Sequence, residues 1–153
     1  MHLAQINIGR LLYPQDDPRV AAFMDNLDAV NAVAERSPGF VWRFKDESGH
    51  ATDVKLFDDP QIIVNASVWE SAETLEQFVF KTVHQKFYAK RRTWFDAAFG
   101  PPLALWWIEE GATPDIHDFA ARWRTLKEGG PTERAFGWEG VASAALWKAA
   151  RCG

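Results

Sequence analysis

The stretch QIIVNASVWES, residues 61–71, decides the fold of this chain. Its side chains alternate between a wholly apolar set and a set that mixes apolar with uncharged polar groups. The apolar set is Ile62, Val64, Ala66 and Val68, and the mixed set is Ile63, Asn65, Ser67 and Trp69. This alternation predicts a β-strand whose two sides meet different surroundings. Ser71 is a good N-cap, so we expect a helix to begin directly after the strand.

The segments on either side complete a regular order of elements. Downstream, the helix is expected to run towards Phe99, where GPP at 100–102 must end it, and LALWWI at 103–108 predicts a buried strand. Upstream, HLAQINIG at 2–9 alternates like the first stretch, a helix follows Pro18, and 40–44 predicts another strand. The order β-α-β-β-α-β predicts an α+β fold of ferredoxin-like plan with an antiparallel sheet.

Residues 111–153 depart from this plan. The segment 115–127 is amphipathic, and 141–150 is a candidate for a last helix. We therefore expect a ferredoxin-like domain over 1–110 and a C-terminal helical extension over 111–153 that packs on the same domain.

The composition disfavours several classes of partner. A formal net charge of −4 argues against nucleic acid, and no apolar segment approaches the ~20 residues of a membrane span. No signal-peptide pattern is visible, and the only cysteine, Cys152, cannot form an internal disulfide, which indicates a reducing compartment. We therefore expect a cytoplasmic protein. The four histidines lack metal-ligand spacing, so no metal site is expected.

A sheet of four strands with two helices leaves one face uncovered, and the mixed face is our candidate. Its polar groups carry no charge, although large apolar side chains lie among them; its members include Leu3, Gln5, Asn7, Ile63, Asn65, Ser67 and Trp69. Such a face suits burial against another sheet around a cavity. We therefore expect a homodimer. The alternative is that the extension 111–153 folds back over this sheet.

The helix after Ser71 carries a group of side chains that could take part in catalysis. At about 100° per residue, Leu75, Val79 and Phe87 face the core, and His84, Tyr88 and Arg91 lie beside them. A base, a phenol and a cation at the edge of a buried face are what the wall of a pocket would offer. In the other interpretation, Tyr88 and Arg91 cover apolar surface and His84 is a satisfied boundary residue.

The strand before this helix adds hydrogen-bonding groups. Asn65, Ser67 and Trp69 share a face with Asn7 of the first strand. Amide and hydroxyl groups can hold an oxygenated ligand, and Trp69 can stack on a flat one. Alternatively, these groups bond to one another across the strands of a dimer interface.

The run NASVWESAETLEQF, residues 65–78, resembles the strand–helix junction of the antibiotic-biosynthesis-monooxygenase-like proteins, which have a dimeric α/β-barrel fold. Over about residues 1–126 the chain more closely resembles the DUF3291 family, whose activity is unassigned. The segments that carry this second resemblance are AQINIGRL (4–11), PGFVWR (38–43), DDPQIIVNASVWES (58–71), His84 through RRTWF (91–95) and LALWWI (103–108).

The resemblance implies two activities. One branch of the superfamily contains cofactor-free, quinone-forming monooxygenases that use Asn, Trp, Tyr and Arg groups, and Asn65 with Trp69 match that set in kind. Asn65 would then bond the oxyanion that forms when a phenolic substrate loses its proton and reacts with O₂. A heme-degrading branch uses elements on which Asn7, Trp69 and His84 fall. However, Trp69 and His84 lie farther apart along this chain than the corresponding pair of that branch.

Our leading hypothesis is a monooxygenase-like enzyme for a small, flat, apolar or phenolic ligand, with no cofactor expected. His84, Arg91 and Asn65 would be catalytic, and the substrate would bind to Asn7, Ser67, Trp69 and Tyr88. The first alternative is a heme-binding or heme-degrading protein. The second is a non-catalytic module for ligand binding or dimer assembly, whose aromatic face is only an interface.

Overall fold

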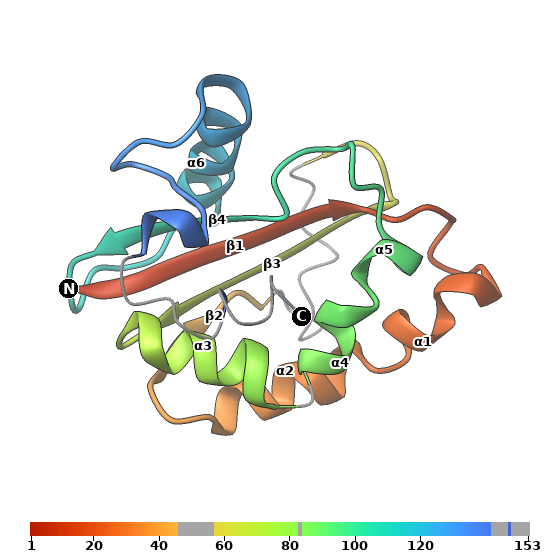
Figure 1. Ribbon diagram of the computed structural model, residues 1–153, viewed down its shortest axis with the longest axis horizontal. Coiled ribbons are helices and arrows are strands. Elements are labelled where there is room, and N and C mark those ends of the chain that lie inside the picture. The colour runs from red at the N-terminus through yellow and green to blue at the C-terminus, as the bar shows by residue number, and fades with distance from the viewer. Residues whose placement is uncertain (46–56, 83, 142–146, 148–153) are drawn as a thin grey trace.

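The computed structural model describes residues 1–45, 57–82, 84–141 and 147. Four strands form one antiparallel sheet in the order β2-β3-β1-β4 (Figure 1). Their bounds are β1 His2–Arg10, β2 Phe40–Arg43, β3 Ile62–Trp69 and β4 Leu103–Ile108. The first strand is central, with Asn7 opposite Asn65 on one side and Leu103 on the other. The predicted α+β, ferredoxin-like plan is therefore confirmed.

The helices of the described residues are mostly short. They are η1 Pro18–Val20, α1 Ala21–Met24, α2 Leu27–Arg36, α3 Ala72–Lys81, α4 His84–Ala89, α5 Arg91–Trp94, α6 Ile116–Gly129 and η2 Trp138–Gly140. Ser71 caps α3 as expected, since its hydroxyl accepts the N–H of Thr74. The helix predicted over 141–150 lies almost entirely outside the described residues.

The mixed face of the sheet is the face that α2 to α5 cover, so the prediction that it is the uncovered face is wrong. Trp69 stacks on Phe78 of α3, with ring centroids 5.2 Å apart. Asn65 donates to Asn31 of α2. Gly9 lies so close to the ring of Phe95, just after α5, that a Cβ at this position would come within 2.7 Å of it. The helices therefore pack tightly on this side.

The extension supplies the cover of the opposite, apolar face. Figure 1 shows α6 on the other side of the sheet from α2, α3 and α4. Phe119 of α6 meets Trp106 of β4 edge-on at 4.6 Å and Trp42 of β2 at 5.7 Å. Ala4, Ile6, Ala66 and Val68 beneath are each at most 3% exposed. One chain thus buries much of both faces, and the folding back that we kept as an alternative occurs on the apolar face.

The long helix predicted from Ser71 to Phe99 is broken into α3, α4 and α5. Thr82 is the first breaking point, because its backbone is extended, with φ −117° and ψ −169°. Its hydroxyl donates to the carbonyl of Phe78 and accepts the backbone N–H of His84. Thr82 thus bonds both the last turn of α3 and the first N–H of α4, and these bonds favour a break over a continuous helix. The helical arithmetic that placed His84, Tyr88 and Arg91 on one stripe therefore does not hold beyond Thr82.

Candidate functional site

Ser67 is the centre of a buried polar network on the helix-covered face. Its Oγ accepts Gln5 Nε2 at 2.6 Å and Trp69 Nε1 at 2.8 Å. The Trp69 ring is fully buried between Phe78 and Phe40, the latter edge-on at 5.6 Å. The polar groups of Gln5 and Trp69 therefore already bond within the protein. A ligand could stack on Trp69 only if Phe78 or Phe40 moved.

The two predicted asparagines lie farther along the same face. Asn65 Nδ2 donates to Asn31 Oδ1 at 3.1 Å, and Asn7 Nδ2 approaches the carbonyl oxygen of Pro102 at 3.4 Å. Both are half-buried, whereas Asn31 is buried. Each primary amide has two N–H donors, so Asn65 keeps one hydrogen after its bond to Asn31. Among the described residues, no acceptor bonds that second hydrogen.

His84 begins α4 at the break after Thr82. Its Nδ1 lies 3.4 Å from the carbonyl oxygen of Val79, and its ring lies 5.0 Å from that of Phe78. Burial lowers the pKa of His84 below its ordinary 6.5, and the Val79 carbonyl opposes this shift only in part. The imidazole is therefore neutral at neutral pH. With Nδ1–H directed at Val79, the lone pair of the imidazole lies on Nε2.

Tyr88 and Arg91 form a pair of their own. Arg91 Nη1 donates to the backbone carbonyl of Tyr88 at 2.7 Å, and its guanidinium lies 4.0 Å above the Tyr88 ring. The Tyr88 ring in turn meets Phe80 of α3 edge-on at 5.1 Å. The guanidinium of Arg91 is thus held by the backbone carbonyl and by the aromatic ring of Tyr88.

The predicted site residues fall into two groups joined by one ring. Asn7, Asn65, Ser67 and Trp69 belong to the sheet, and His84, Tyr88 and Arg91 belong to α4 and α5. Phe78 contacts both Trp69 and His84. Sequence reasoning missed Phe78, because nothing in its spacing distinguishes it from an ordinary core residue of α3. Its place directly between a predicted stacking ring and a predicted base is a property of the fold.

The chain after α6 returns to the helix-covered side. Trp138 of η2 packs on Phe80 at 5.8 Å, and its buried Nε1 has no hydrogen-bond partner within the described part of the chain. The buried carboxylate of Glu76, on α3, accepts the backbone N–H of Trp147 at 3.1 Å. The extension therefore contributes side chains to both sides of the sheet.

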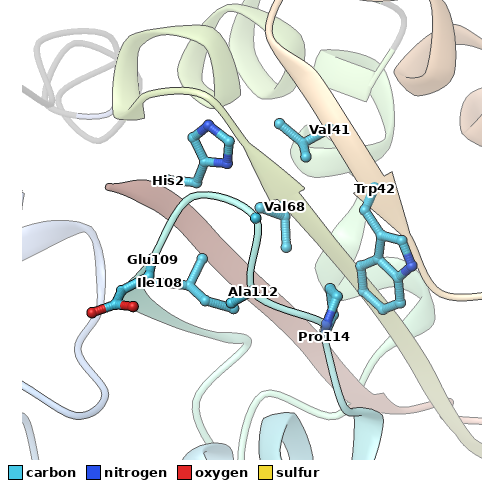
Figure 2. A pocket seen from close by; sticks show the side chains of 9 residues that line it. His2, Val41, Trp42, Val68, Ile108, Glu109, Ala112 and Pro114 are labelled. Carbon is cyan, nitrogen blue, oxygen red and sulfur yellow. The ribbon is translucent and has the colours of Figure 1, made fainter.

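A hollow of about 240 Å³ lies on the other side of the sheet (Figure 2). Its lining is mostly apolar and comes from β1, β2, β3, the end of β4 and the loop that precedes α6: His2, Val41, Trp42, Val68, Ile108, Glu109, Gly111, Ala112 and Pro114. None of the predicted site residues lines it. The hollow and the His84 region are therefore separate places in the molecule.

A heme does not fit between the three residues that the heme-degrading branch would assign to it. Phe78 contacts both Trp69 and His84, so it takes the space that the macrocycle would need between them. The indole N–H of Trp69 is bonded to Ser67, and the amide of Asn7 is directed at Pro102. Among the described residues, no group of three or more His, Cys, Asp or Glu side chains could hold a metal ion.

Comparison with known proteins gives a family and a fold. The family model "Domain of unknown function (DUF3291)" matches residues 2–152. No curated protein matches the sequence. The crystal structure of SnoaB, a cofactor-independent oxygenase from Streptomyces nogalater, is similar with a TM-score of 0.50 and 15% identity, over 74% of this chain and 98% of that chain. In the part of the chain that the structure describes, no helix combines the length and apolar character of a membrane span.

Proposed function

The chain belongs to the DUF3291 family, whose function is unknown, and from this premise we propose that it is an oxygenase-like enzyme for a small, flat, phenolic substrate. The observation that carries the proposal is His84, a neutral imidazole oriented by the Val79 carbonyl and placed against Phe78. The cofactor-independent activity of SnoaB, which shares the fold, supports a reaction without a bound cofactor.

The proposed reaction begins with proton transfer. His84 Nε2 takes the acidic proton of a phenol or its keto form, and the remaining N–H of Asn65 bonds the oxyanion. The anion passes one electron to O₂, and the two radicals combine to form a C–O bond. Loss of water from the resulting hydroperoxide leaves a carbonyl, so that CH₂ and O₂ become C=O and H₂O. Arg91 supplies a counter-charge next to Tyr88.

Two predicted binding residues take indirect roles in this proposal. Ser67 and Trp69 are buried and bonded to each other, and Trp69 stacks on Phe78. They therefore position Phe78, and the substrate lies against Phe78, His84 and Tyr88. Asn7, whose amide is directed at Pro102, borders the face at the far end from Trp69.

Dithranol, a flat phenolic anthrone, is a suitable probe. We expect the protein to accelerate oxygen uptake and the appearance of the quinone absorption, and His84→Ala to remove most of this acceleration. The matched control is His117→Ala, because His117 is exposed on α6, on the opposite side of the sheet. No acceleration with the intact protein, or equal rates in the two variants, would overturn the proposal.

A non-catalytic module is the second candidate, and the self-satisfied network of Gln5, Ser67 and Trp69 favours it. In that case flat ligands would bind without turnover and His84→Ala would leave their affinity unchanged. The heme alternative has less support, since Phe78 stands between Trp69 and His84. Adding hemin tests it directly, because a Soret band that disappears in His84→Ala is expected only of a heme protein.

A cytoplasmic homodimer is part of the same proposal, although the argument that first suggested it no longer holds. The mixed face is covered by α2 to α5, so a second copy must use another surface. Light scattering at micromolar concentration measures the mass directly. A mass equal to one chain would remove the dimer from the proposal and leave the proposed chemistry of His84 untouched.

A further inference from the structure

The helices that hold His84 carry an unbalanced positive charge. From Gln77 to Phe95 the sequence contains no carboxylate, although the whole chain has a net charge of −4. The cations of this segment, which we call the basic surface, are Lys81, Lys86, Lys90, Arg91 and Arg92.

No ion pair compensates these charges in the part of the chain that the structure describes. Lys81, Lys86, Lys90 and Arg92 are exposed, and none forms an ion pair with a carboxylate of the described residues. Elsewhere in the chain arginines are paired, as Arg10 is with Asp59 and Arg122 with Asp118. The difference leaves a positive field around α4 and α5.

The internal arrangement of the basic surface is unfavourable by itself. Lys86 lies on α4 and Lys90 follows directly after that helix, before Arg91 and Arg92 of α5, so like charges follow one another along this part of the chain. Arg91 is half-buried and directs its donor to the carbonyl of Tyr88 rather than to an acid. The carboxylate that α3 carries nearest to this segment in sequence, Glu76, is buried and accepts the N–H of Trp147. No carboxylate within residues 77–95 therefore neutralises these cations.

We propose that the ligand of the His84 site is an aromatic anion, a flat ring system that carries a carboxylate or a similar acidic group, drawn in by the basic surface. This inference rests on the proposed function. Lys86 lies on α4, the helix that His84 begins, and Lys90 follows that helix directly. A helix is about 10 Å across, comparable with the Debye length in dilute salt. Their field therefore reaches the ligand. The neutral imidazole of His84 and the amide of Asn65 accommodate a negative ring system without charge repulsion.

A matched pair of flat probes separates charge from shape. Rhein carries a carboxylate where chrysophanol carries a methyl group, and the two are otherwise the same hydroxylated anthraquinone. Isothermal titration with the full-length protein should give tighter binding of rhein. Added sodium chloride should weaken the binding of rhein and leave the binding of chrysophanol almost unchanged. Salt screens the attraction between the carboxylate and the cations, and chrysophanol has no carboxylate.

Variants assign the effect to the basic surface. In Lys86→Gln/Lys90→Gln/Arg92→Gln we expect the affinity for rhein to fall by roughly 1.5- to 5-fold for each charge removed, with chrysophanol unaffected. Arg134→Gln is the control, because Arg134 is exposed beside α6, where its carbonyl accepts Arg122. Circular dichroism checks that each variant is folded.

The outcomes distinguish the two proposals. If both probes bind equally and His84→Ala weakens both, the preference for an anion is overturned and the proposed site stands. If neither probe binds, both proposals fall. If Arg134→Gln lowers the affinity for rhein as much as the triple variant does, the basic surface does not attract rhein specifically and the inference is overturned.

Discussion

The hydroxyl of Ser67 is where two buried donors meet. Gln5 is 7% exposed and Trp69 is fully buried, and both donate to the same oxygen. Because both side chains are buried, removal of that acceptor leaves the two donors without a partner. A single oxygen atom therefore accepts two buried donors, one from each of two neighbouring strands.

Ser67→Ala is expected to lower the free energy of unfolding by about 2–4 kcal/mol, since two buried donors lose their acceptor. Urea unfolding followed by tryptophan fluorescence measures this. The matched control is Ser37→Ala, because the Ser37 hydroxyl only donates to the Val33 carbonyl; its cost should stay below about 1.5 kcal/mol. Equal costs for the two variants would contradict the central role of Ser67.

His84 makes stability depend on pH. Burial holds the pKa of its imidazole in the folded protein below 6.5, so the unfolded chain binds the proton more readily. Its contribution to stability is therefore complete above about pH 6.5 and is lost as the pH falls towards the lower folded-state pKa. His84→Gln should flatten this part of a plot of unfolding free energy against pH, whereas His117→Gln should retain the slope. A slope that survives in His84→Gln would show that another group causes it.

At the scale of elements, Thr82 determines where α3 ends and where α4 begins. Its hydroxyl donates to the carbonyl of Phe78 and accepts the backbone N–H of His84. Thr82→Ala should therefore cost about 0.5–2 kcal/mol, as the loss of a helix cap does. We also expect the His84 imidazole signals in NMR to shift, because α4 loses its anchor. Thr82→Ser keeps the hydroxyl and should restore both properties; a serine variant that behaves like alanine would contradict this explanation.

The strands were predictable because their signal is local. The alternation at 62–69 and the apolar run at 103–108 correspond to β3 and β4 within one residue. The break at Thr82 was not predictable from periodicity, because threonine is tolerated within a helix, and its capping role depends on the positions of Phe78 and His84. Helical arithmetic carried across that break consequently grouped His84 and Arg91 on a stripe that does not exist.

The choice of the covered face was the larger error, and its cause is physical. Alternation shows that two faces differ, but it does not show which face meets the helices. Neutral polar groups such as Asn65 and Ser67 suggested a face that packs against a second copy of the chain. In fact Asn65 donates to Asn31, and Ser67 accepts from Gln5 and Trp69, beneath the helices, where uncharged polar groups can be satisfied without burying a charge.

At the scale of the whole molecule, the sheet is covered on both sides by its own chain. Phe119 of α6 joins the extension to the sheet through Trp106 and Trp42. Phe119→Ala should therefore lower the free energy of unfolding by about 3–5 kcal/mol, and far- and near-ultraviolet circular dichroism should still report one transition. Thr125→Ala, an exposed change on the same helix, should cost less than about 0.5 kcal/mol. If α6 melts separately, the extension is an independent unit.

The central position of β1 has a consequence for how the protein is made. Among the described residues, β1 pairs with β3 and β4, both of which are synthesised after it. The edge of β1 that pairs with β4 therefore stays unpaired until the chain has been translated past Ile108. Because such distant pairings make folding slow, this edge of β1 is exposed in the nascent chain during that interval. The complete sheet can therefore form only after β4 has been translated.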